Sequence, residues 1–167
     1  HSIEDGHAGD RDQGADEPAD DHSGRASEDR RQGTHRHRAA DEDGLQQVAE
    51  DAVLNANYVL RSCDDLLEAP FGAAGPCMHE ALFSDSGLAE GFSTLDIAKG
   101  LIDEGFHPMT VYFPLVVHGA LLVEPTETES KAGLDRFIAS LRNRAQRAKA
   151  GDESLKSAPH FAPRRRL

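Results

Sequence analysis

The pattern of apolar and polar positions divides this chain of 167 residues near Asp43. Before that point Ile3 is the one large aliphatic residue, aromatic residues are absent, and charged residues and histidine abound. Such a segment buries too little apolar surface to offset the conformational entropy that folding removes. The pattern therefore predicts a disordered, acidic and His-rich leader over residues 1–43 and a folded domain over residues 44–167.

The folded region is predicted to open with a helix that runs to about Arg61. Asp43 and Gln46 have the spacing of an N-cap residue and its N3 partner. Apolar residues then recur at helical spacing and form a broad face. The members of this face are Leu45, Val48, Ala49, Ala52, Val53, Ala56, Val59 and Leu60. Glycine and proline after Phe71 indicate a loop, and the segment 77–84, CMHEALFS, follows as a short predicted strand.

The densest apolar stretch of the chain is the segment 92–131. Ser93 or Thr94 can cap a helix there, Asp96 suits its first turn, and Gly105 supplies a left-handed stop. Proline and glycine interrupt the apolar run that follows, so the pattern predicts two short extended segments. These segments are Val111–Val117 and Ala120–Glu124.

A last helix is predicted to end at Gly151. Thr126 and Glu129 have capping-box spacing, and Thr128 is a second candidate for the cap. The apolar face of this helix consists of Leu134, Phe137, Ile138, Leu141, Ala145 and Ala148. The order helix, strand, helix, strand pair, helix predicts an α+β fold, with helices packed on one face of a small, mostly antiparallel sheet.

Charge and composition narrow the function classes. The net charge of −12 argues against a general nucleic-acid binder or a binder of anionic membranes. The apolar run of residues 111–123 is too short to span a bilayer, and the first residues lack the apolar core of a secretory signal. Cys63 and Cys77 do not make a disulfide framework and suit a reducing compartment. Because residue 1 is His and not Met, we expect a processed chain or a fragment.

The common catalytic motifs are absent from the sequence, which has no G-x-S-x-G elbow, no P-loop and no dinucleotide-binding glycine pattern. A zinc site would have to draw on Cys63, Cys77, His79 and His107, which lack the close paired spacing of structural zinc motifs. His35 and His37 lie in the polar leader, where a solvated tail is the simpler interpretation. The sequence therefore predicts no metal site.

Two places in the central stretch are candidates to face a cleft. His118 lies beside Gly119 in the apolar run, where a lone histidine is more often a hydrogen-bonded core residue. The second place is the rim formed by Thr126, Glu127, Thr128 and Glu129, whose first interpretation is a helix cap. No residue of this chain is predicted to be catalytic.

Four segments of the sequence carry a family resemblance. They are DGLQQVAEDAVLNANYVL, GPCMHEALFS, TLDIAKGLIDEGFHPMTVYFPLVVHGALLVEPTETESK and APHFAPRRRL. Together they resemble the C-terminal part of the glycine cleavage system P-protein, the glycine dehydrogenase (decarboxylating), and in particular its subunit 2 in organisms with a split P-protein. The resemblance covers residues 43–167 nearly continuously, and residues 1–43 do not share it.

This resemblance implies the small C-terminal domain of a fold-type-I transferase that depends on pyridoxal 5'-phosphate. The family is an oxidoreductase of glycine catabolism that acts on a CH–NH2 group with a disulfide acceptor. Glycine loses carbon dioxide, and its aminomethyl group passes to the lipoyl arm of the H-protein. The implied partners are the large domain or subunit 1, lipoylated H-protein and glycine. The implied location is the bacterial cytoplasm, or the mitochondrion in a eukaryote.

The family attaches its cofactor to a lysine that follows a histidine in a glycine-rich loop, and this chain has no such lysine. Its four lysines are Lys99, Lys131, Lys149 and Lys156. We therefore expect the chain alone to be inactive. Two functional hypotheses stay open: a part of the decarboxylating enzyme, or a non-catalytic fragment or binding module that retains only the shape of the small domain.

Overall fold

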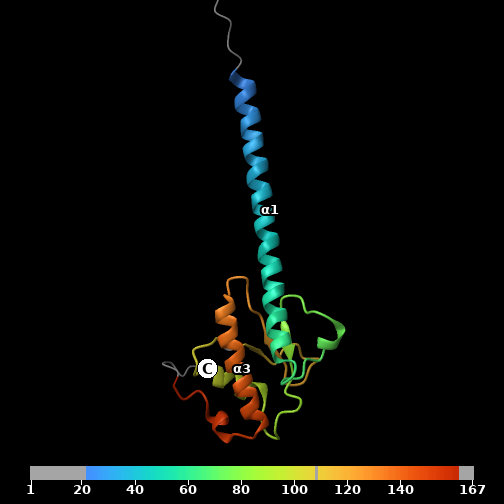
Figure 1. Cartoon of the computed structure of the whole chain (residues 1–167), viewed down its shortest axis with the longest axis vertical. Coiled ribbons are helices and arrows are strands. Elements are labelled where there is room, and N and C mark those ends of the chain that lie inside the picture. Colours follow the sequence, from blue (N-terminus) through green and yellow to red (C-terminus); the bar gives the residue numbers. More distant parts are fainter. Residues whose placement is uncertain (1–21, 108, 162–167) are drawn as a thin grey trace, which may run out of the picture. The chain divides into compact units, whose positions relative to one another are not determined.

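The computed structural model describes the backbone of residues 22–107 and 109–161, and the side chains from residue 42 onward within these ranges. The chain divides into two units, residues 1–41 and residues 42–167. The second unit holds the strands, the helices α2 and α3 and the described core (Figure 1). None of the described helices combines the length and the hydropathy of a membrane-spanning segment.

Helix α1 spans His22–Cys63, so it begins well before the predicted start at Asp43. Residues 22–43 are helical in the structure, whereas the sequence predicted disorder there, and residues 1–21 lie outside the described residues. A physical reason is that nucleation is the costly step of helix formation. Each further residue adds a hydrogen bond to a helix that is already anchored by packing, even when the residue is polar.

The apolar face of α1 is buried only at its C-terminal end. Ala56, Val59 and Leu60 are buried, whereas Leu45 and Val48 are exposed. The apolar face that the sequence predicts is therefore present on α1. Among the described residues, other parts of the domain cover this face only at the last turns of the helix.

The sheet has three antiparallel strands in the order β1-β3-β2. They are β1 (Ala81–Phe83), β2 (Thr110–Val111) and β3 (Leu121–Val123). The register pairs Leu82 with Leu122 and Thr110 also with Leu122. This confirms the predicted antiparallel sheet and the α+β fold class.

The first extended segment is much shorter than predicted. The prediction of Val111–Val117 was wrong beyond Val111, because the chain turns at Pro114, whose carbonyl accepts a hydrogen bond from the Val117 amide over 3.1 Å. Proline has no amide hydrogen to donate to a ladder, so it favours such a break. Leu115 and Val116 are consequently exposed on a loop and do not lie in a strand.

Helix α2 (Thr94–Ile102) agrees with its sequence signals. Ser93 is the N-cap residue, and the Asp96 carboxylate accepts a hydrogen bond from the Ser93 amide over 2.9 Å. Gly105 follows the helix with φ of 86°, the left-handed value that a glycine stop requires. These local signals therefore predicted both ends of α2.

Helix α3 spans Lys131–Lys149, and its start differs from the prediction. Neither Thr126 nor Thr128 is the cap. Ser130 caps the helix, because its hydroxyl accepts a hydrogen bond from the Gly133 amide over 3.1 Å. The two threonine hydroxyls instead bond to each other over 2.8 Å.

The core lies where α1, α2 and α3 meet one face of the sheet. The predicted apolar face of α3 packs there, with Phe137 at its edge. Two short 3₁₀ turns complete the domain, η1 (Gly72–Ala74) and η2 (Glu153–Ser157). The fully buried side chains include Val59, Cys63, Leu67, Phe83, Ile97, Leu101, Leu121, Leu141 and Leu155.

Candidate functional site

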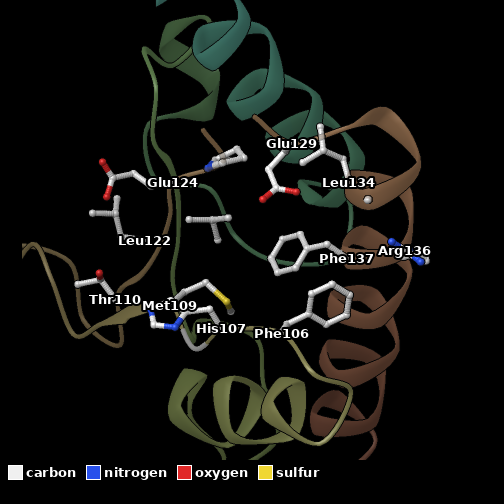
Figure 2. A pocket seen from close by; sticks show the side chains of 13 residues that line it. Phe106, His107, Met109, Thr110, Leu122, Glu124, Glu129, Leu134, Arg136 and Phe137 are labelled. Atoms are coloured by element: carbon white, nitrogen blue, oxygen red, sulfur yellow. The ribbon is translucent and has the colours of Figure 1, made fainter. Parts of the chain in front are cut away.

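A cleft of about 380 Å³ lies between the sheet and the N-terminal half of α3 (Figure 2). Its side chains come from the segment after α2, from β2 and β3, and from α3. The lining residues are Phe106, His107, Met109, Thr110, Leu122, Val123, Glu124, Pro125, Glu129, Gly133, Leu134, Arg136 and Phe137. This cleft is therefore largely apolar, with charged groups around it.

Two aromatic rings form one side of this cleft. Phe106 follows the Gly105 stop, and its amide donates to the Leu101 carbonyl over 3.1 Å, which fixes the direction of the chain after α2. Phe137 projects from α3. The two ring centroids are 5.5 Å apart with an interplanar angle of 75°, an edge-to-face contact (Figure 2). Both rings are half-buried at this wall of the cleft.

The charged groups of the cleft come from three segments. Glu124 directly follows β3, Glu129 directly precedes the Ser130 cap, and Arg136 lies on α3. Glu124 and Glu129 lie on opposite sides of the cleft, and the Glu129 carboxylate points toward its interior (Figure 2). No serine, cysteine or lysine is among the described residues that line the cleft. The cleft therefore combines apolar walls with charged groups of both signs and with the polar side chains of His107 and Thr110.

The structure does not bring the two predicted cleft-facing places together. His118 lies on the loop before β3 with a side chain that is 94% exposed, and its Nδ1 is 2.9 Å from Oδ1 of Asp85. It does not line the cleft. Of the predicted rim, Glu129 lines the cleft, whereas Thr126, Glu127 and Thr128 do not. Whether any of these residues acts in function stays a prediction.

Sequence reasoning missed most of the cleft. Phe106, His107, Arg136 and Phe137 were not predicted as site residues. Phe137 was placed on the buried face of the last helix, and Phe106 follows the predicted Gly105 stop. The sequence thus showed that each phenylalanine lies in or beside a helix. It did not indicate that Phe106, after α2, packs against Phe137 of α3.

The described residues offer one cluster with the geometry of a metal site. His79 Nε2 lies 3.8 Å from Oε1 of Glu80 and 3.9 Å from Oε1 of Glu124. All three side chains are exposed, and exposed acidic groups commonly cluster without a metal ion. Cys63, a member of the zinc set considered above, lies in the core, where burial raises the pKa of its thiol to about 12. A thiolate ligand is disfavoured at that position.

The described residues form a small α+β domain, and its cleft carries aromatic, aliphatic and charged side chains. Such an architecture does not by itself define an activity. Residues 48–160 match the family model "Glycine dehydrogenase, C-terminal domain". The chain belongs to this family.

Curated relatives agree with that assignment. A protein of Caulobacter vibrioides described as "Probable glycine dehydrogenase (decarboxylating) subunit 2" is 67% identical over 127 residues, which are 75% of this chain and 24% of the relative. Proteins of the same description from Thermotoga maritima and Listeria innocua are each 47% identical, over 75% of this chain and 26% and 25% of their own lengths. The chain therefore spans about a quarter of the length of these relatives.

Proposed function

We propose that this chain supplies the C-terminal domain of the P-protein of the glycine cleavage system. The whole enzyme would decarboxylate glycine and transfer the aminomethyl group to the oxidised lipoyl arm of the H-protein, whose disulfide is reduced in the transfer. The observation that carries the proposal is the 67% identity over 127 residues to a glycine dehydrogenase subunit 2. The apolar cleft, with charges of both signs beside it, is a surface on which such a domain could help to shape an active site.

The described residues do not fit a covalent site for pyridoxal 5'-phosphate. Such a site needs a lysine that faces the cofactor, and no lysine lines the cleft. Lys131 donates to Asp135 over 2.8 Å, and Lys156 donates to Glu153 over 2.9 Å and lies 4.5 Å from the centre of the Phe92 ring. We therefore place the cofactor lysine in the part of the enzyme that the relatives have and this chain lacks.

The contribution of this domain to the reaction is then structural and electrostatic. Phe106 and Phe137 would keep water from one wall of the active site, which strengthens every electrostatic interaction within it. Glu129 and Arg136 offer charges of both signs beside that wall. The proposed partners are subunit 1, lipoylated H-protein and glycine, and the proposed location is the cytoplasm of a bacterium.

We also propose that the enzyme domain is residues 44–167 and that residues 1–43 form a leader outside it. The family match begins at residue 48, close to this boundary. Limited proteolysis of the purified chain would test the boundary, because a folded domain protects its backbone from cleavage. We expect a stable product that begins near Asp43. Rapid cleavage throughout residues 44–161 would exclude an independently folded domain.

A chimera tests the proposed function. In it, the matched region of the Caulobacter vibrioides subunit 2 is replaced by residues 42–167 of this chain. We expect the chimera, together with subunit 1, pyridoxal 5'-phosphate and lipoylated H-protein, to release labelled carbon dioxide from carboxyl-labelled glycine. The subunit 2 without its matched region is the negative control, and the intact relative is the positive control.

The chain alone is assayed beside the chimera. We expect it to show neither carbon dioxide release nor the absorbance of a lysine-bound cofactor. A chimera that folds and binds the cofactor but does not release carbon dioxide would instead favour a non-catalytic fragment or binding module that retains only the shape of the domain.

A further inference from the structure

The sheet has apolar side chains on both of its faces. Ala81 and Phe83 of β1 and Leu121 of β3 are completely buried against the helices. Successive side chains of a strand point to opposite faces, so Leu82 and its register partner Leu122 point away from this core. A sheet with leucines on its second face is typically covered on that face as well.

A groove of about 400 Å³ lies beside Leu82 and Leu122, and its other walls come from loops, from η1 and from Leu60 of α1. We call it the outer groove. Its lining residues are Leu60, Phe71, Gly72, Ala74, Gly75, Pro76, Cys77, Glu80, Leu82, Phe113, Pro114 and Leu122. Phe71 and Phe113, which stand at the groove, are 60% and 56% exposed. The two phenylalanine rings at the outer groove are therefore largely exposed to solvent and do not complete a core on this side of the sheet.

The loop that carries Phe113 continues into two more exposed apolar side chains. Leu115 is 88% exposed and Val116 is 84% exposed, and Met78 in the loop before β1 is exposed too. Single exposed apolar residues are ordinary on a protein surface, but a contiguous group beside an apolar groove marks an interaction surface. The Pro114–Val117 turn holds the two side chains out from the domain.

One side of the outer groove is acidic. Glu80 lines the groove, and Glu124 lies near it, since both carboxylates are within 4 Å of His79 Nε2. Among the described residues, the ion pairs of these two carboxylates are made with His79 alone. Two neighbouring carboxylates repel each other, so an arginine or lysine from a partner would stabilise them.

We propose that the outer groove and the loop Tyr112–Val116 are the docking surface for the part of the glycine dehydrogenase subunit that this chain lacks. The occupant would be an apolar segment of that part, flanked by a basic residue that meets Glu80 and Glu124. The relatives are about four times as long as the matched region, so a covering polypeptide of sufficient size exists in them. This inference rests on the proposed function and assigns the contact surface within it.

The chimera described above provides the test, with hydrogen exchange of the peptide that covers residues 112–118 as the readout. We expect exchange of these amides to be slower in the chimera than in the chain alone by about tenfold or more, because docking removes the loop from solvent. The double substitution Leu115→Asp and Val116→Asp in the chimera should return the exchange to the rate of the chain alone. Both positions are exposed, so the fold of the domain should survive, which circular dichroism checks.

A matched control separates docking from a general effect of a new charge. Phe161 is 83% exposed and lies outside the groove, so Phe161→Asp should leave the exchange of residues 112–118 unchanged. The acidic border has its own variant, Glu80→Lys, which should speed the exchange by about threefold, the size expected for one ion pair.

Equal exchange of residues 112–118 in the chimera and in the chain alone would overturn the docking proposal. So would slow exchange that persists in the chimera with Leu115→Asp and Val116→Asp. A third contrary outcome is exchange of the chain alone that slows as its concentration rises. The last outcome would assign the groove to a second copy. Carbon dioxide release is scored separately. A protected but inactive chimera contradicts the proposed function and leaves the docking surface standing, and an active chimera with an unprotected loop does the opposite.

Discussion

Two nitrogens of the Arg142 guanidinium group on α3 donate hydrogen bonds to the carboxylate of Asp65. Asp65 lies just beyond the end of α1. The same side chain donates to the Ser62 carbonyl over 2.6 Å, one of the last carbonyls of α1. The hydrogen bond from Arg142 lowers the pKa of the Asp65 carboxyl below its usual value. Arg142 thus joins α3 to the C-terminal end of α1, where Ser62 is 80 residues away in sequence.

Replacing this arginine by lysine should destabilise the domain. Arg142→Lys keeps the charge but loses the two-pronged geometry, so we expect the free energy of unfolding to fall by about 1 kcal/mol, the upper end for a partly exposed pair. Urea denaturation measures it. A double-mutant cycle with Asp65→Asn isolates the pair, and a coupling energy of zero would show that the Ser62 contact alone accounts for the loss.

Gly119 is predicted to tolerate no side chain. Its φ is +56°, and a Cβ atom there would lie 2.0 Å from the Asp85 carboxylate carbon. We expect Gly119→Ala to cost about 2–3 kcal/mol, from the left-handed backbone and from displacement of Asp85. Thermal unfolding measures the loss.

Gly87 is the matched control for this prediction. Its φ is +79°, but a Cβ atom there would meet nothing within 4 Å. Gly87→Ala should therefore carry only the backbone cost, about 1 kcal/mol. Adding Asp85→Ala to Gly119→Ala should recover part of the difference. If both glycine variants lose the same stability, the contact with Asp85 does not matter.

The start of α3 gives a direct test of the corrected cap. Ser130→Ala removes the hydroxyl that accepts from the Gly133 amide, so the domain should lose about 1 kcal/mol of stability. Thr128→Ala, two residues earlier, should cost clearly less because Thr128 caps nothing. Chemical denaturation of both variants decides between them, and a larger loss for Thr128→Ala would restore the cap that the sequence suggested.

Helices α2 and α3 show which features of the fold could be predicted from the sequence and which could not. The ends of α2 were predictable because Ser93, Asp96 and Gly105 act within one or two turns. The start of α3 was not, because the segment 126–130 contains three hydroxyl residues at competing cap positions. Which of them caps depends on where the chain leaves β3, and that is set by contacts distant in sequence.

The site was less predictable than the fold. Glu129 was predicted to face a cleft and lines one, but the pair of Phe106 and Phe137 emerges only when the ends of α2 and α3 are brought together. His118 was selected because it interrupts an apolar run, yet that run leaves the sheet at Tyr112, and the histidine lies exposed beside Asp85. Periodicity identifies which residues share a face, and says nothing about what covers it.

Helix α1 allows a measurement that separates residues that merely belong to an apolar face from residues of that face that are covered. Val48 and Val59 belong to the same predicted face, but Val59 is completely buried and Val48 is 42% exposed. We expect Val59→Ala to cost about 2 kcal/mol by leaving a cavity, and Val48→Ala to change stability by less than about 0.5 kcal/mol. The identical chemistry of the two substitutions makes each the control for the other. Equal losses would mean that the N-terminal part of the face is covered in the chain alone.

The last prediction concerns acid stability. Arg147 donates to the Asp152 carboxylate over 2.7 Å, and this bond, with those from Ser154, lowers the pKa of Asp152 from 3.8 to about 2. Because the folded state holds the proton less tightly than the unfolded state, the contribution is fully present above about pH 4. It is lost as the pH falls toward 2. Asp152→Asn should therefore lower the melting temperature at pH 6 and make its decline between pH 4 and pH 2 shallower.

An NMR titration of the Asp152 carboxyl carbon checks the cause. In Arg147→Gln the pKa of this carboxyl should rise toward its ordinary value, because the strongest donor to the charged form is gone. The amide of Ser154 still donates to the carboxylate in that variant, over 3.1 Å, so the return should be incomplete. A pKa that stays near 2 without Arg147 would assign the shift to Ser154 and the turn of η2, and the acid sensitivity would then be a property of that turn.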